Sequence, residues 1–175
     1  MKTFAIFYEA ERVTKIGTKA KKLLESVEQL PDGTYRGTRH GAIIYALDPQ
    51  LLKLHRIGGP AVVALDYKAW YVNGERHRID GPAYEGENHK EWFVNGQQHR
   101  IDGPAFESEN QKVWYINGKR HRIDGPAIVE PGYKGWYVDG EQLTEDGYND
   151  LVKRLSTLTD DSDRAATIAA ATMFD

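Results

Sequence analysis

The sequence predicts a mainly β fold of tandem 22-residue β-hairpin repeats, with an N-terminal strand-helix element before them and C-terminal capping helices after them. Two observations predict it. The four tryptophans of the 175-residue chain lie 22 residues apart, and Asn-Gly or Asp-Gly begins three residues after each: Trp70, Trp92, Trp114 and Trp136. A His-Arg-Ile-Asp-Gly-Pro-Ala block keeps the same period from His77, His99 and His121, with a weaker copy from His55. Such a period is typical of units that bury their apolar faces only against neighbouring units.

Residues 1–50 are expected to form the N-terminal element and a degenerate first repeat. An apolar run at residues 3–8 predicts a strand, and apolar side chains at helical spacing over residues 18–30 predict an amphipathic helix. Pro31-Asp32-Gly33 has the turn chemistry to end that helix. Residues 42–47 are typical of a buried strand, and their start loosely resembles Pro60-Ala61-Val62-Val63.

Residues 51–143 are expected to form the hairpin array. Asn73-Gly74 and its equivalents supply the positive φ angles of a two-residue type I′ turn, so each repeat should contain a hairpin. A second turn is expected at Asp80-Gly81-Pro82, where the glycine would take the unusual backbone conformation. The four indoles are expected to stack into one continuous core with the aromatic residues that follow them, Tyr71, Phe93, Tyr115 and Tyr137.

Residues 144–175 are expected to cap the array with helix. Thr144 suits a helix N-cap, Glu145 and Asp146 suit the positive end of the helix dipole, and an apolar face begins at Tyr148 and Leu151. This helix would cover the open strand edge of the last repeat. A second, alanine-rich helix is expected from residue 161 or 163 to about residue 174, either packed on the array or able to dock a partner.

Composition restricts the class of protein. The chain has no cysteine, which leaves no disulfide, thiolate zinc site or cysteine nucleophile and fits a reducing compartment. The N-terminal run is too short for a signal peptide, and no stretch reaches the length of a membrane span. We therefore expect a soluble, cytoplasmic protein without a membrane partner. The array region, residues 55–143, has 11 basic and 13 acidic residues, so it lacks the basic excess of a generic nucleic-acid binder.

The repeat resembles a known family. The pattern Trp-x-x-Asn-Gly-x-x-His followed by glycine is similar to the membrane-occupation-and-recognition-nexus (MORN) repeat. The longer pattern Trp-Tyr-x-Asn-Gly-x-x-His-Arg-x-Asp-Gly-Pro-Ala looks most like repeats of tailed-phage and large-DNA-virus proteins. The resemblance covers residues 55–143 and implies a hairpin-repeat sheet with a binding or scaffolding role and no active site. Gly81 stands four residues after His77, where the MORN repeat has three, so MORN partner surfaces are not carried over.

Two sets of polar residues, the histidines and the arginines, recur with the same 22-residue period as the tryptophans. The histidines would bind a metal only if three or four converged, so packing beside Ile79, Ile101 or Ile123 and a hydrogen bond to a turn are favoured. The arginines could hold phosphates, but an aspartate two residues on shares the face of each. We therefore expect structural pairs, Arg78 with Asp80, Arg100 with Asp102, and Arg122 with Asp124. At Arg56 the aspartate is replaced by Gly58, which predicts a free arginine.

No catalytic residue, metal ligand or cofactor is assigned. The 22-residue repeats space identical groups evenly along the array, whereas catalysis needs unlike groups at one point. The favoured function is non-enzymatic protein binding. The viral resemblance favours an intracellular phage-type factor that binds and modulates or inhibits a host or defence protein. The candidate binding residues are Arg56, the aromatic residues Tyr71, Phe93, Tyr115 and Tyr137, and Tyr84, His89, Phe106 and Tyr133 of the variable segments.

Three alternatives remain open. A nucleic-acid-binding protein would use the arginines for phosphates and the aromatic rings for base stacking. A virion structural component would sediment with particles. An enzyme would need a pocket that joins Tyr8, Glu9 and His40.

Overall fold

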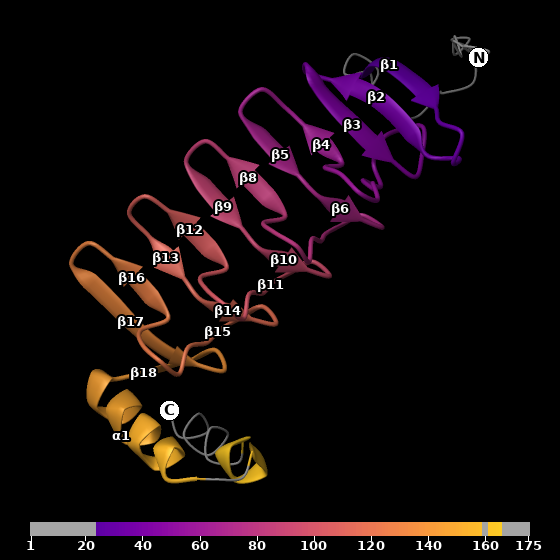
Figure 1. The fold of residues 1–175 in the computed structure, drawn as a ribbon. Helices are drawn as coiled ribbons and strands as arrows, with labels where there is room; N and C mark the ends of the chain where they lie inside the picture. Colours follow the sequence, from indigo (N-terminus) through magenta and orange to yellow (C-terminus); the bar gives the residue numbers. More distant parts are fainter. Residues whose placement is uncertain (1–23, 159–160, 166–175) are drawn as a thin grey trace, which may run out of the picture. The chain divides into compact units, whose positions relative to one another are not determined.

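The structure is a computed structural model that describes residues 24–158 and 161–165. The chain divides into two compact units, residues 1–87 (unit 1) and residues 88–175 (unit 2). The strand predicted at residues 3–8 lies outside the described residues, as does most of the second C-terminal helix, of which residues 161–165 are described as helical. Both units are built mainly from antiparallel strands (Figure 1).

Unit 1 contains six hydrogen-bonded strands in the order β1-β2-β3-β4-β5-β8. Their neighbours pair antiparallel, and a separate two-stranded hairpin joins β6 to β7. The bounds are β1 (Leu24–Gln29), β2 (Tyr35–Arg39), β3 (Ala42–Ala46), β4 (Val62–Val63), β5 (Tyr67–Ala69), β6 (Tyr71–Val72), β7 (Glu75–Arg76) and β8 (Tyr84–Gly86).

The helix predicted over residues 18–30 is wrong for its described part, because residues 24–29 form β1. β1 pairs with β2 around a turn in which Gly33 has a φ of 84°. Pro31-Asp32-Gly33 therefore forms the turn of a β-hairpin and does not end a helix. The Asp32 carboxylate supports this turn by accepting hydrogen bonds from the Thr34 backbone N–H at 3.0 Å and the Thr34 hydroxyl at 2.6 Å. The strand predicted at residues 42–47 is present as β3.

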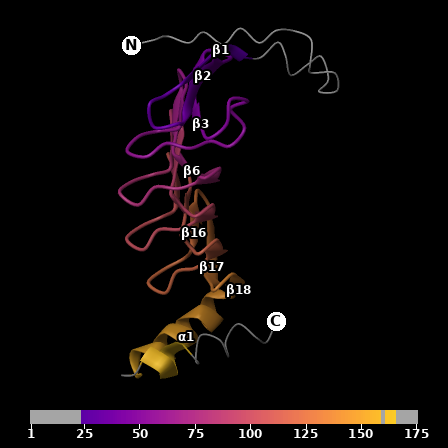
Figure 2. The same ribbon diagram turned by 90° about the vertical axis from the view of Figure 1, so that its right-hand side faces the viewer.

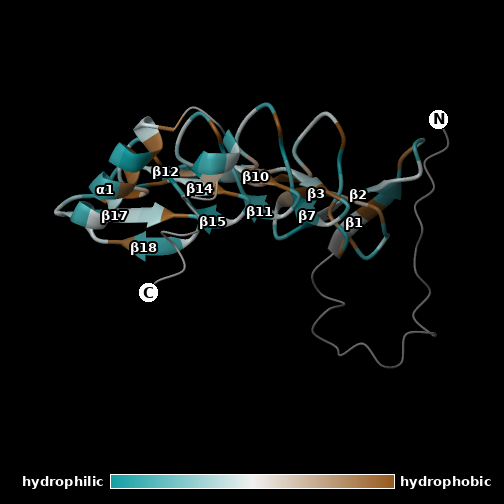
Figure 3. Ribbon diagram, turned by 90° about the horizontal axis from the view of Figure 1, so that it is seen from below, coloured by the Kyte–Doolittle hydropathy of each residue, from teal (hydrophilic) through white to brown (hydrophobic). Residues whose placement is uncertain are grey.

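Unit 2 contains six strands in the order β9-β12-β13-β16-β17-β18, followed by the helix α1. Two further hairpins pair β10 with β11 and β14 with β15, and their second strands are hydrophilic (teal in Figure 3). The bounds are β9 (His89–Glu91), β10 (Phe93–Val94), β11 (Gln97–Gln98), β12 (Phe106–Ser108), β13 (Lys112–Val113), β14 (Tyr115–Ile116), β15 (Lys119–Arg120), β16 (Ile128–Glu130), β17 (Tyr133–Val138), β18 (Glu141–Leu143) and α1 (Glu145–Ser156).

The predicted Asn-Gly turns have the expected backbone. Asn73 and Gly74 have φ angles of 54° and 89°, and Asn117 and Gly118 have 50° and 78°. Asparagine tolerates this left-handed region better than most residues, and glycine has no Cβ to clash there. These two-residue turns connect the strands of hairpins β6–β7 and β14–β15, and Asp139-Gly140 has the same conformation between β17 and β18.

Alanines, and not the tryptophans, are fully buried within residues 61–127, which corrects the expectation of a continuous indole core. Ala61 and Ala83 in unit 1, and Ala105 and Ala127 in unit 2, have no exposed surface. Backbone hydrogen bonds join three of the tryptophans, Trp70, Trp92 and Trp114, to the alanine 13 residues later, for example Trp92 N to Ala105 O at 2.8 Å. The methyl groups are enclosed at these junctions. The four tryptophans are only half-buried.

The helix α1 closes the end of unit 2, as the sequence predicts. Thr144 is its N-cap, and the Thr144 Oγ1 accepts a hydrogen bond from Gly147 N at 3.1 Å. Glu145 and Asp146 occupy the first turn, where their negative charges interact favourably with the positive end of the helix dipole. The helix buries an apolar cluster against Val138, with Trp136 packed beside it: Tyr148, Leu151 and Leu155. Trp136 and Tyr148 have ring centroids 4.5 Å apart.

Candidate functional site

Each of three tryptophans is covered by an arginine eight residues later. The Arg78 Cζ lies 4.1 Å from the Trp70 ring centroid in unit 1. In unit 2 the equivalent distances are 4.1 Å for Arg100 over Trp92 and 3.9 Å for Arg122 over Trp114. A guanidinium over an indole face is attracted by the ring quadrupole, with a gain of about 0.5–2 kcal/mol depending on desolvation. Trp136 differs, because Tyr148 of α1 lies against its ring.

A glycine faces the other side of each guanidinium, which corrects its predicted role. A Cβ on Gly81 would lie 2.9 Å from Arg78 Cζ, and one on Gly103 would lie 2.8 Å from Arg100 Cζ. Neither glycine has a φ in the left-handed region. Gly81 and Gly103 are therefore needed for space beside their arginines and do not supply an unusual backbone angle in the second turn, whereas the equivalent Gly125 has a φ of 159°.

The remaining hydrogen-bonding capacity of these arginines is largely used inside the loop. Arg78 Nε lies 3.1 Å from Asp80 Oδ1, and Arg78 Nη1 donates to Pro82 O at 3.2 Å. The pairs Arg100–Asp102 and Arg122–Asp124 have Nε–Oδ1 distances of 3.0 Å and 2.8 Å. Hydrogen bonding from its arginine is the main reason that the pKa of each of the three aspartates lies below the usual 3.8.

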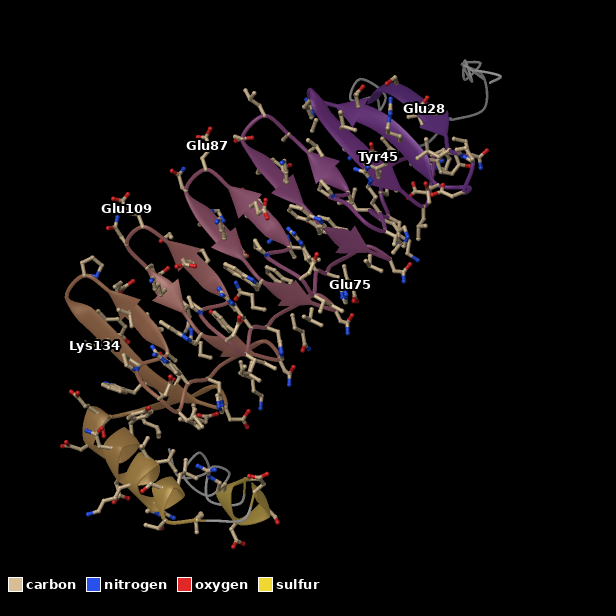
Figure 4. All side chains as sticks on the ribbon, viewed as in Figure 1. Glu28, Tyr45, Glu75, Glu87, Glu109 and Lys134 are labelled. Atoms are coloured by element: carbon tan, nitrogen blue, oxygen red, sulfur yellow. The ribbon has the colours of Figure 1, made fainter. Side chains whose placement is uncertain are left out.

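Arg56, predicted to be free, makes two of the contacts that hold the others, although Gly58 leaves it without an aspartate at the equivalent position. Its Cζ lies 3.9 Å from the ring centroid of Tyr45, which is labelled on β3 in Figure 4, and its Nη1 donates to Pro60 O at 3.2 Å. A Cβ on Gly59 would meet its Cζ at 3.1 Å. Tyr45 thus stands where the other loops have tryptophan.

The histidines support the turns of the hairpins. Three histidines accept a hydrogen bond at Nδ1 from the backbone N–H of the residue 18 positions later, at 3.0–3.1 Å. The pairs are His55 with Asn73, His99 with Asn117, and His121 with Asp139. His77 also has a partner. In the described part of the chain, no three histidine or acidic side chains gather as metal ligands would. Burial lowers the pKa of His121 below its usual 6.5, which favours the neutral, accepting form.

Three of the four predicted aromatic platforms contact arginines of the chain itself. Tyr71 Oη accepts a hydrogen bond from Arg76 Nε at 3.2 Å, and Tyr115 Oη accepts one from Arg120 Nε at 3.4 Å. The second of these hydrogen bonds raises the pKa of Arg120. The Arg120 Cζ also lies 5.1 Å from the Tyr137 ring centroid. Phe93 is half-buried and likewise has a partner.

Three of the four residues chosen from the variable segments stack on an aromatic ring within their own unit. Tyr84 stacks on Tyr67 with ring centroids 5.4 Å apart in unit 1. His89 stacks on Phe106 at 5.4 Å in unit 2, and its Nε2 lies 3.0 Å from Glu91 Oε1. Tyr133 is exposed at the start of β17.

Sequence reasoning missed the exposed isoleucines that the loops of both units carry. Ile79 and Ile101 expose 83% and 84% of their surface, so they do not pack beside the histidines as predicted. Ile57 and Ile123 occupy the equivalent loop positions and expose 74% and 43%. In unit 2 the loops that carry Ile101 and Ile123 project to one side of the strands (Figure 2). The signal was present in the sequence, because these isoleucines follow the 22-residue period.

Sequence reasoning also missed a cavity of about 890 Å³ in unit 1. Strands β3, β4 and β5 contribute to its lining, as do Leu51, Leu52 and Leu54 of the loop after β3. His40, named for a possible enzyme site, lines this cavity, whereas Tyr8 and Glu9 lie outside the described residues. The leucine-rich stretch after Asp48 was the available signal.

Across residues 24–158 and 161–165, no helix combines the length and the apolar character that crossing a membrane requires. Comparison of the chain with family models, with curated proteins and with solved structures gives no match.

Proposed function

We propose that the protein is a non-enzymatic protein-binding module made of MORN-like tandem β-hairpin repeats, and that its isoleucine-bearing loops contact the partner. The observation that carries this proposal is the exposure of Ile79 and Ile101 on loops whose neighbouring polar groups are already paired internally. A large aliphatic side chain at a loop tip contributes nothing to the core. Covering one completely would stabilise a complex by about 1.5–3 kcal/mol.

The loops are also fixed before binding. In the loops of Ile79, Ile101 and Ile123 the arginine lies on an indole, donates to the proline carbonyl and pairs with the aspartate, for example 3.3 Å from Arg100 Nη1 to Pro104 O. A partner therefore loses little free energy in ordering these segments, which is the main advantage of a preorganised contact surface.

Nucleic-acid binding is less favoured by the same contacts. The side chains of Arg78, Arg100 and Arg122 are only 21%, 22% and 21% exposed, and each donates within its own loop. Their charge is offset by an exposed aspartate beside each one. Phosphate binding would require these contacts to be broken, whereas a protein partner can use the exposed isoleucines as they stand.

The resemblance to phage repeats directs the choice of partner. We take a host or defence protein of an infected bacterium as the class to test first, with the module blocking or modulating that protein. Affinity capture from a bacterial lysate followed by mass spectrometry would identify candidates, and binding would then be measured with purified components.

The decisive variant is Ile101→Asp/Ile123→Asp in unit 2. We expect it to weaken binding of the purified partner by at least about tenfold, the loss that corresponds to about 1.4 kcal/mol. Leu52→Asp is the matched control, because Leu52 is 73% exposed and belongs to unit 1, outside the two loops that are changed. Unchanged affinity in the isoleucine variant would refute the proposed contact surface. Binding of a 20-nucleotide single strand that falls steeply with added salt would instead support the nucleic-acid alternative.

A further inference from the structure

The loop after β3 departs from the regular hairpin geometry in unit 1. Trp70 O accepts a hydrogen bond from His77 N, seven residues later, at 3.1 Å. Tyr45 O accepts the corresponding bond from His55 N, ten residues later, at 3.0 Å. Tyr45 therefore occupies the place of a tryptophan, and the connection that follows it is three residues longer. Departures from a regular pattern tend to mark functional positions.

The additional residues belong to the loop after β3 that carries Leu51, Leu52 and Leu54. This segment, the leucine loop, has an unusual backbone. Asp48 Oδ2 accepts hydrogen bonds from Leu52 N at 3.2 Å and from Lys53 N at 2.6 Å. Leu51 has a φ of 55°, a region that branched side chains rarely adopt, and it is buried with 1% exposed. Gly37 leaves the space for it, because a Cβ there would lie 2.7 Å from Leu51 Cδ1. The loop is thus held in a strained conformation, which is frequent at binding sites.

The cavity of about 890 Å³ lies beside this loop. Its floor includes Ile44, Val62 and Ala69, which pair across β3, β4 and β5. Nine of its 17 lining residues are alanine, valine, isoleucine or leucine, so most of the wall suits a hydrocarbon. The volume falls in the range of about 300–1,000 Å³ that is usual for small-molecule sites.

The charged part of the lining favours an anion. Arg39 and Arg76 line the cavity together with one acidic residue, Asp66. Arg39 Nη2 donates to Gln50 O at 2.9 Å, whereas its Nε is buried and has no hydrogen-bond partner among the described residues. A buried donor without an acceptor costs about 1–3 kcal/mol, more when it is charged. An anionic oxygen in the cavity beside this guanidinium would offset part of that cost through charge attraction, although the covered Nε itself is out of its reach.

We propose that this cavity binds a free long-chain carboxylate, with the hydrocarbon tail on the aliphatic floor and the carboxylate at Arg39. Strands β2 to β5 span about 14 Å at the usual spacing of about 4.8 Å between strands, which suits an extended chain laid across them. Leu52, 73% exposed on the leucine loop, would be covered by the tail. The site is independent of the isoleucine loops.

The test is calorimetric titration of the full-length protein with dodecanoate below its micelle concentration, and with dodecanol as the uncharged match. We expect saturable binding of one dodecanoate per chain, at least about tenfold tighter than dodecanol, because a charge-assisted pair with arginine strengthens only the acid. Absence of saturable binding, or equal affinity for the two compounds, would overturn the proposal.

Two variants locate the ligand. Arg39→Gln should remove the preference for dodecanoate over dodecanol. Because Arg39 also holds the leucine loop through Gln50, a second variant is needed that leaves this contact intact. Leu52→Asp places a negative charge beside the tail without removing a core side chain, and should weaken dodecanoate binding at least about tenfold. Ile101→Asp, at a position that is 84% exposed in unit 2, is the matched control and should bind dodecanoate like the wild type.

Unchanged binding in Leu52→Asp would place the ligand elsewhere and refute the assignment. The two proposals fail separately. Leu52→Asp should affect only the carboxylate, and Ile101→Asp/Ile123→Asp should affect only the protein partner.

Discussion

At the scale of single residues, one arrangement explains three of the recurring positions. An arginine lies between the face of an aromatic ring and a glycine, and it ties together the loop that carries the exposed isoleucine. The arginine, the tryptophan and the glycine are therefore expected to depend on one another. Removing any one of them should reduce the effect of changing the others, which is the signature of residues in direct contact.

Gly103→Ala is predicted to lower the free energy of unfolding by about 1–2 kcal/mol, the usual cost of overpacking. The added Cβ would lie 2.8 Å from Arg100 Cζ and displace the guanidinium from Trp92 and Asp102. Urea denaturation would measure the loss. In an Arg100→Ala background the same substitution should cost little, because the obstructing side chain is gone. An equal cost in both backgrounds would show that the glycine is needed for its backbone and not for the space.

The stability of the protein should also depend on the protonation of His121. Its neutral Nδ1 accepts a hydrogen bond from Asp139 N at 3.1 Å, and burial lowers its pKa below the usual 6.5. A base whose pKa is lower in the folded state stabilises the fold fully above its unfolded pKa. That contribution is lost as the pH falls through the folded value.

The free energy of unfolding should therefore decrease between about pH 7.5 and about pH 5, and part of this decrease should disappear in His121→Gln, which does not titrate. This window stays above the usual pKa of 3.8 of the paired aspartates, so their protonation does not contribute. Denaturant titration at the two pH values is the measurement. An identical pH dependence in wild type and variant would exclude His121 as the titrating group.

At the scale of secondary structure elements, sequence prediction succeeded where the local signal was backbone chemistry. Asn117-Gly118 has the predicted positive φ angles, and Thr144 caps α1 as predicted. It failed over residues 24–29, where helical spacing of apolar residues was mistaken for a helix and pairing with β2 produces a strand. Short apolar runs are ambiguous between the two periods, and tertiary pairing decides the outcome.

The candidate site was harder to predict than the elements. The Arg78–Asp80 pair is local and could be proposed from alternation alone. The stacking of Arg78 on Trp70 brings together residues on either side of a hairpin, so no strand periodicity indicates it. The exposed state of Ile79 was missed because isoleucine is usually buried, and a one-dimensional pattern does not tell a core position from a loop tip.

The N-cap of α1 offers a test at this scale. Thr144→Ala removes the acceptor for Gly147 N and is predicted to destabilise unit 2 by about 1 kcal/mol, the usual value for a lost N-cap. Thr144→Ser keeps the hydroxyl and should behave like the wild type. Thermal unfolding followed by circular dichroism would compare the three proteins. If the alanine variant were as stable as the serine variant, the cap would contribute nothing to holding α1 on Val138.

At the scale of the whole molecule, the proposed repeat architecture predicts tolerance of deletions of one period. Deleting residues 93–114 removes 22 residues and joins Trp92 directly to Tyr115. The hydrogen bond from Trp92 N to Ala105 O would then be replaced by its equivalent to Ala127 O, since Trp114 N makes that bond in the intact chain. Every later side chain keeps the face that it has now.

The shortened protein should therefore fold and unfold cooperatively, with a lower free energy of unfolding and a smaller urea dependence, because repeat arrays lose one unit and one interface at a time. Deleting residues 93–113 is the matched control, because a shift of one residue turns each following side chain to the opposite face of its strand. We expect that control to lose cooperative unfolding. If both deletions were equally damaging, the 22-residue period would reflect sequence resemblance without interchangeable structural units, and the proposed repeat architecture would be wrong.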